Sequence, residues 1–166
     1  MSPLVQVSAS VQAVRRGVEH LIRSQDQDGS WHGRRGANYI HETFLALRGL
    51  RAAGEDDREA HMLRAGEWLR SIQNADGGWG ESFSTSDPDT FVPAESTASR
   101  TAWAILGLLA SGDSRSLSVV TGVEYLLKTQ REDGSWDEEP AAGAGFPLLA
   151  LSAYLKARGT GGGEGA

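Results

Sequence analysis

The chain has 166 residues, of which 39% are hydrophobic and 23% are charged, with a formal net charge of −6 at pH 7 and no cysteine. This length and apolar content suffice for one folded domain, while the missing cysteine excludes disulfides, cysteine-ligated zinc and a cysteine nucleophile. The acidic balance argues against nucleic acid as the main partner, and no apolar run approaches the 18 residues of a transmembrane helix. Residues 1–8 carry no secretory signal, so we expect a cytoplasmic protein.

The first predicted element is a helix that ends near Gln25. Apolar residues recur before it at helical spacing, at Val11, Val14, Val18, Leu21 and Ile22. The segment Gln25 to Trp31 (QDQDGSW) follows, and its Asp-Gly step predicts a turn with glycine at a positive φ. A second helical stretch runs from Ile40 to Ala52.

The same order of elements then recurs twice. A helix ends near Gln73, the segment 73–79 (QNADGGW) predicts a second turn, and the loop 81–95 leads into a helix over 97–111. A further helix ends near Gln130, the segment 130–136 (QREDGSW) predicts a third turn, and a last helix follows over 146–158. The glycine-rich residues 159–166 predict a disordered tail, which leaves 1–158 as one helical repeat domain.

All three turns share the pattern Q-x-x-D-G-[SG]-W, and their tryptophans are 48 and 57 residues apart. Repeats of this period indicate stacked helix pairs, propeller blades or arrays. Strand-like alternation is nearly absent, so we predict an all-α fold of six helices in antiparallel helix-pair repeats, without strands.

Four segments, in this order, resemble those of one enzyme family. They are DGSWHGRRGANYI (28–40), GGWGE (77–81), STASRTAW (96–103) and GAGFP (143–147). They are similar to segments of the squalene-hopene and oxidosqualene cyclases, which are class II terpene cyclases, and the three turns resemble the QW motifs of that family. We call 25–31, 73–79 and 130–136 the first, second and third QW turns.

The resemblance implies a terpene cyclase-like toroid, of which six helices make about half of an α6/α6 barrel. It also implies that each QW glutamine bonds terminal backbone groups of helices and that the tryptophan stacks on it; these residues are Gln25, Trp31, Gln73, Trp79, Gln130 and Trp136. A half barrel has two apolar edges, which a partner or self-association normally covers. We therefore expect a homodimer, or a heteromer with another cyclase-like chain.

The family reaction protonates an alkene or epoxide of an isoprenoid substrate and closes rings through carbocations. The resemblance assigns Trp103, Phe146 and Tyr154 to the substrate pocket, with Tyr39 and His41 beside them. Plain helix packing is the competing interpretation of these aromatic residues. Ala150, Leu151 and Ala157 stand where the family has further aromatic residues, which predicts a roomier pocket and a changed substrate or lost activity.

The D-x-D-D motif that carries the family's proton donor does not occur in this sequence. Within this chain, Asp87 and Asp89 (DPDT) are the candidate catalytic acids, although loop turn chemistry also explains them and a partner's aspartate fits the role better. The four histidines form no metal-binding pattern, so we expect neither a metal nor a cofactor.

The sequence favours a class II terpene cyclase-like enzyme or a subunit of one. Two alternatives stay open at this point: a half barrel that binds an isoprenoid or another apolar ligand without chemistry, and a structural repeat scaffold or inactive fragment. The family resemblance also leaves peripheral contact with a membrane open.

Overall fold

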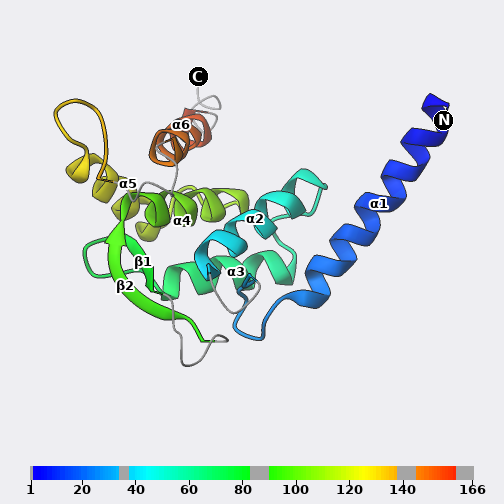
Figure 1. Cartoon of the computed structure of the whole chain (residues 1–166), viewed down its shortest axis with the longest axis horizontal. Coiled ribbons are helices and arrows are strands. Elements are labelled where there is room, and N and C mark those ends of the chain that lie inside the picture. The colour runs from blue at the N-terminus through cyan, green and yellow to red at the C-terminus, as the bar shows by residue number, and fades with distance from the viewer. Residues whose placement is uncertain (1, 34–37, 83–89, 138–144, 160–166) are drawn as a thin grey trace, which may run out of the picture.

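A computed structural model describes residues 2–33, 38–82, 90–137 and 145–159 (Figure 1). Six helices and one short sheet follow one another in these residues. They are α1 (Pro3–Ser24), α2 (Tyr39–Ala52), α3 (Ala60–Ser71), β1 (Trp79–Ser82), β2 (Val92–Thr97), α4 (Ala98–Ala110), α5 (Leu117–Thr129) and α6 (Phe146–Gly159). The six predicted helices are confirmed, and the predicted tail over 160–166 lies outside the described residues.

The helices form two rows, and α4 lies at the centre. The row that we call the inner row is α2, α4 and α6, and α4 packs against both of its neighbours. The other, outer row is α1, α3 and α5, each of which ends at a QW turn and precedes a helix of the inner row. The core lies between the rows, where Leu47, Leu69 and Ile105 are fully buried.

The starts of several helices are fixed by side chains that bond free backbone N–H groups. The hydroxyl of Thr97 accepts a hydrogen bond from the N–H of Arg100 at the start of α4, and Ser116 caps α5 in the same way. Ser2 caps α1, and Pro3 occupies its first turn, where a missing N–H costs nothing.

The prediction that the chain has no strand was wrong. Strands β1 and β2 pair antiparallel within the predicted loop 81–95 and its flanks, with Trp79 opposite Thr97 and Ser82 opposite Val92. The strands approach closely at Gly80, where a Cβ atom would collide with the carbonyl oxygens of Ala94 and Glu95. A short irregular hairpin of this kind lacks the alternation of apolar and polar residues from which strands are predicted.

Helix α1 differs from the other five helices. It extends away from the rest of the molecule, and only its C-terminal part lies near α2 (Figure 1). None of its residues is buried. Within the described residues, no helix is both long enough and apolar enough to cross a bilayer.

Candidate functional site

The glutamines of the first two QW turns each join a turn to the next helix of the outer row. The side-chain amide of Gln25 donates to the carbonyl oxygen of Gly29 and to that of His61 in α3, both at 2.9 Å. The amide of Gln73 donates to Gly77 at 2.7 Å and to Ser118 in α5 at 2.9 Å. Each glutamine therefore couples consecutive repeats.

The tryptophans of all three turns close the helices that precede them. Their indole N–H groups donate to carbonyl oxygens in the last helical turn, from Trp31 to Leu21, from Trp79 to Leu69 and from Trp136 to Leu126, at 2.7–2.9 Å. The last carbonyls of a helix lack the usual backbone partner one turn further on; the carbonyl of Leu21 also accepts from the hydroxyl of Ser24, and that of Leu126 from the backbone N–H of Gln130. The indole therefore takes the terminal carbonyl, while the glutamine bonds the turn and, at the first two turns, the following helix.

The glycine of each Asp-Gly step has the positive φ that the sequence predicts, at 99° for Gly29, 87° for Gly77 and 86° for Gly134. Only glycine adopts this conformation without strain. At Gly29 and Gly77 a second constraint applies. A Cβ atom would lie 2.5 Å from the carbonyl oxygen of Arg64 and 2.6 Å from that of Thr121, so these turns touch the backbone of the next helix.

Two threonines that the sequence analysis did not single out hold the first two turns to the inner row. The backbone N–H of Trp31 donates to the hydroxyl of Thr43 in α2, and that of Trp79 to the hydroxyl of Thr101 in α4. Both threonines are fully buried. They follow their tryptophans at different distances in the sequence, so no fixed spacing marks them.

Four aromatic rings from the inner row form a cluster. His41 and Phe44 belong to α2, Trp103 to α4 and Phe146 to α6. The ring centroids are 4.6 Å apart for His41 and Trp103, 5.6 Å for Trp103 and Phe146, and 6.3 Å for Phe44 and Phe146, all edge to face. Phe44 was not among the predicted pocket residues, although it lies one turn beyond His41.

Trp103 is the one member of this aromatic cluster with a buried polar atom that has no partner in the described part of the chain. Its indole nitrogen is buried and makes no hydrogen bond there. A buried N–H without an acceptor costs about 1–3 kcal/mol, and few buried polar groups in folded proteins are left without a partner.

The two other predicted pocket residues lie outside the cluster. Tyr39 and His41 are two positions apart on one helix, so their side chains leave it on different sides. The ring of Tyr39 meets Phe91 and His32 instead. Tyr154 packs beside the hydrophobic core from α6, and no ring contact among the described residues joins it to Trp103 or Phe146.

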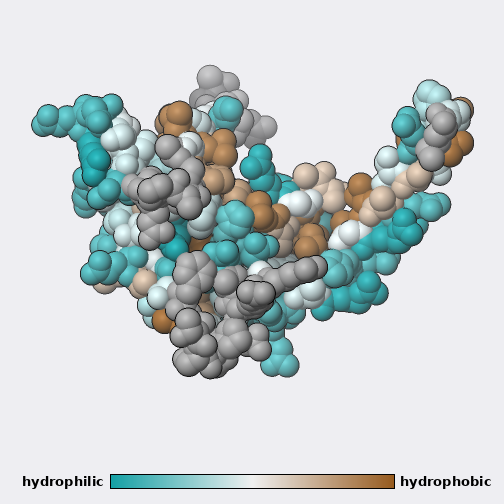
Figure 2. Space-filling model, viewed as in Figure 1, coloured by the Kyte–Doolittle hydropathy of each residue, from teal (hydrophilic) through white to brown (hydrophobic). Residues whose placement is uncertain are grey.

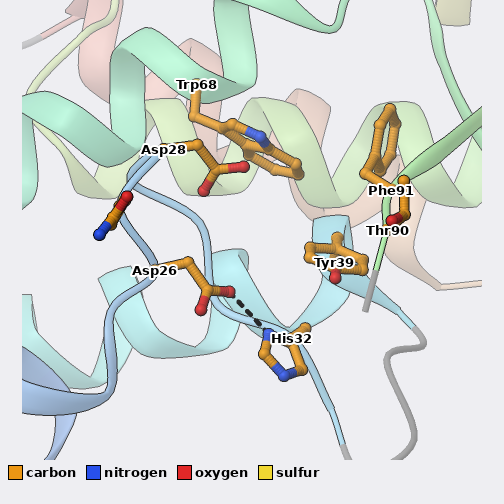
Figure 3. A pocket seen from close by; sticks show the side chains of 8 residues that line it. Asp26, Asp28, His32, Tyr39, Trp68, Thr90 and Phe91 are labelled. Carbon is orange, nitrogen blue, oxygen red and sulfur yellow. Dashed lines mark hydrogen bonds and ion pairs between the residues drawn. The ribbon is translucent and has the colours of Figure 1, made fainter. Parts of the chain in front are cut away.

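Tyr39 lines a separate pocket of about 760 Å³ beside the first QW turn (Figure 3). Its wall is aromatic, with Trp68 and Phe91 edge to face at 5.4 Å. Its rim is polar, because the carboxylate of Asp26 pairs with His32 at 2.6 Å. The other lining residues are Gln27, Asp28 and Thr90. The pocket could hold an apolar group that carries a polar or cationic end.

Glu81, from the GGWGE segment, is a buried carboxylate that the sequence analysis left without a role. It accepts hydrogen bonds from the backbone N–H groups of Tyr39 at 2.8 Å and Ile40 at 3.2 Å, and so caps the start of α2 from another element. Burial raises its pKa, against the lowering effect of those two N–H groups and of the nearby charges of Arg100 and His41.

This pKa gives a pH-dependent contribution to stability. The folded chain binds the proton of Glu81 more tightly than the unfolded chain, so protonation favours the fold. The contribution is complete below the ordinary carboxyl pKa and disappears as the pH rises through the folded-state pKa. We expect the free energy of unfolding of the wild type, measured by urea denaturation relative to that of Glu81→Gln, to increase as the pH falls from 7 to 4. A relative stability of the wild type that instead increases with rising pH would contradict this.

The candidate acids Asp87 and Asp89 lie outside the described residues. The described residues contain no group of three acidic or histidine side chains that could hold a metal ion. The site that the structure presents is therefore the aromatic cluster, with the capped start of α2 and the Tyr39 pocket beside it.

Helix pairs closed by QW turns, with aromatic residues on the inner row, define an α/α toroid protein of the terpene cyclase class. The chain belongs to the squalene-hopene cyclase family, because the family model of the squalene-hopene cyclase C-terminal domain matches residues 2–159.

Individual relatives agree with this assignment. A probable squalene-hopene cyclase of Sinorhizobium fredii is 45% identical over 159 residues, which cover 93% of this chain and 25% of that protein. The squalene-hopene cyclase of Alicyclobacillus acidocaldarius is 46% identical over 135 residues, covering 81% of this chain and 21% of that protein. The chain thus spans about a quarter of the length of these relatives.

A solved structure supports the fold. The type II terpene cyclase MstE from Scytonema has a TM-score of 0.54 and 22% sequence identity, covering 72% of this chain and 33% of that chain. At this identity the likeness concerns the helical toroid alone.

Proposed function

We propose that this chain forms one wall of a class II cyclase site, at which an acyclic isoprenoid such as squalene is protonated and closed into rings. The observation that carries the proposal is the meeting of His41, Trp103 and Phe146 from three inner helices. The names of the relatives, squalene-hopene cyclases at 45–46% identity, support the substrate class.

Cyclisation through carbocations places two requirements on the wall of the site. Carbocation intermediates need aromatic faces, each worth about 2 kcal/mol when desolvated, and they need water kept away from the cation. Trp103 supplies the largest face of the cluster. An isoprenoid of this kind dissolves in bilayers, so the proposal includes peripheral contact with a membrane surface.

The proton donor is the part of the site that this sequence does not carry as D-x-D-D. We propose that it comes from another cyclase-like chain or from a second copy, together with the other half of the barrel. Asp87 and Asp89 are the acids within this chain that could serve instead, and they directly precede Thr90 of the Tyr39 pocket.

A chimeric enzyme tests both parts. Residues 2–159 would replace the matching segment of the Alicyclobacillus relative, and cyclic products from squalene would be measured by gas chromatography. Trp103→Ala should lower the rate by about 10-fold or more, since roughly 1.4 kcal/mol of lost cation stabilisation corresponds to a factor of ten. The double variant Asp87→Asn and Asp89→Asn should keep the rate, because the acid lies in the rest of the chimera.

Three outcomes would revise the proposal. A Trp103→Ala chimera as fast as its parent would remove the aromatic cluster from catalysis. Loss of turnover in the double aspartate variant, with unchanged melting, would move the acid into the loop of this chain. An inactive parent chimera that folds and still binds squalene would favour the alternative function.

That alternative is an isoprenoid-binding half barrel without chemistry. A specific observation favours it: Ala150 stands where the family has an aromatic residue, and it is fully buried in the core. The wall therefore has fewer aromatic faces near α6 than the family resemblance implies. A purely structural scaffold would neither bind squalene nor turn it over.

A further inference from the structure

The third QW turn has the internal bonds of the other two turns but lacks their external contacts in the described residues. The amide of Gln130 donates to Gly134 at 2.9 Å, as in the other turns. Gln25 and Gln73 each add a bond to the carbonyl of the next outer helix. At Gly134 a Cβ atom would meet, among the described residues, only the amide nitrogen of Gln130, at 4.0 Å. Among the described residues, nothing at the third turn occupies the place that the next outer helix takes at the first two.

Helix α1 has side chains that are exposed where the equivalent side chains of the other outer helices are buried. When the outer helices are aligned on their closing glutamines, Val14 of α1 takes the position of Met62 in α3 and Val119 in α5. Met62 and Val119 are fully buried, whereas Val14 is 50% exposed. Helix α1 thus has the sequence of an outer helix, but no described residue covers it as Met62 and Val119 are covered in α3 and α5.

The same alignment places Arg16 at the position of Arg64. In α3, the guanidinium of Arg64 donates to the side-chain oxygen of Gln25 in the first QW turn. Arg16 is exposed, and the side-chain oxygen of Gln130 is the corresponding acceptor in the third turn. The donor and the acceptor of the contact that joins the first two repeats are therefore both present a second time, as Arg16 and Gln130, at opposite ends of the molecule.

Apolar side chains mark the same two ends. Most exposed large hydrophobic residues of the described chain lie on α1 and α6. On α1 they form a stripe that continues the partly buried Val18 and Leu21 toward the N-terminus, with Val7 63% and Val11 56% exposed (Figure 2). On α6, Leu148 is 63% and Leu155 is 69% exposed. Patches of this kind normally mark an interface.

We propose that the occupant of the third QW turn is α1 of a second copy of this chain. The part of α1 around Arg16 packs on the third turn of its partner, where Arg16 donates to the partner's Gln130, and the residues of α1 that precede it pack on the partner's α6. Because each copy offers both surfaces, two copies joined head to tail form a ring with two identical seams. This deepens the proposed function by naming the joint between the two halves, but its test measures mass and not turnover, so either proposal can fail alone.

The test is light scattering of the purified chain over a concentration series. The wild type should have twice the 17.7 kDa mass of one chain. Gly134→Asn should weaken the dimer at least 10-fold, because any side chain there meets the incoming helix backbone, while asparagine tolerates a positive φ. Arg16→Glu should do the same by removing the donor and adding a charge beside the acidic third turn.

Two matched variants serve as controls. Gly54→Asn has the same kind of conformation, at φ 94°, with nothing within 4 Å of its Cβ. Arg15→Glu makes the same charge change one residue earlier on α1, on a different side of the helix. Both should keep the wild-type mass, and far-ultraviolet circular dichroism should show all four variants folded.

Mixing the two interface variants tests the head-to-tail geometry. A mixed dimer of Arg16→Glu and Gly134→Asn carries both changes in one seam and leaves the other seam intact, so dimer should reappear at intermediate strength. A wild type that stays monomeric at the highest concentration reached would overturn the proposal. A dimer that both variants leave unchanged, or a mixture that stays monomeric, would overturn this interface.

Discussion

Replacing Trp79 by alanine should lower the free energy of unfolding by about 3–5 kcal/mol, the usual cost of removing a fully buried large aromatic side chain. Trp79 is 0% exposed, and its indole N–H satisfies the terminal carbonyl of Leu69. The alanine variant loses the buried surface and leaves that carbonyl without a donor. Thermal and urea denaturation followed by circular dichroism measure the loss.

Substitution by alanine should not lower the free energy of unfolding equally at the three QW tryptophans. Trp31 is 5% exposed and should cost nearly as much as Trp79, whereas Trp136 is only partly buried and should cost clearly less. All three make the same hydrogen bond to the preceding helix, so the difference isolates the contribution of packing between repeats. Equal losses at Trp79 and Trp136 would contradict this view, and a Trp79→Ala protein that melts like its parent would refute the structural role itself.

The repeat pattern was enough to predict the helices and the turns between them. Helical spacing of apolar residues and the recurring Asp-Gly step placed six helices and three positive-φ glycines, because both signals are local and each is repeated three times. The hairpin of β1 and β2 could not be predicted in this way. It depends on the close approach of Gly80 to Ala94 and Glu95, which is a contact between segments and leaves no periodic trace.

The candidate site was likewise predicted only in part from the sequence. Trp103 and Phe146 were identified because they fall within segments that resemble the family, and His41 because it directly follows one; the structure brings their rings together. Tyr39 lies in the same kind of segment but leaves α2 on another side, where it lines a pocket that the sequence did not reveal. The cap that Glu81 provides for α2 joins residues about forty positions apart, so only the folded chain shows it.

Replacing Gly77 by alanine should cost about 2–4 kcal/mol, whereas the same change at Gly134 should cost about 1 kcal/mol. Both glycines have a positive φ, at 87° and 86°, so both variants carry the same backbone strain of roughly 1 kcal/mol. Only at Gly77 would the new methyl group lie 2.6 Å from the carbonyl oxygen of Thr121, which belongs to the rigid backbone of α5. Overpacking of that kind adds about 1–3 kcal/mol.

The comparison measures how strongly a QW turn is seated on the following helix, because local strain cancels between the two sites. Urea denaturation should be run at low protein concentration, where association with a second copy contributes least to stability. Gly54→Ala, which has a positive φ and no neighbour within 4 Å, supplies the strain alone and should match Gly134→Ala. If Gly77→Ala were no more costly than these two variants, the contact between the second turn and α5 would contribute nothing to the fold, and the case for an equivalent contact at the third turn would fall with it.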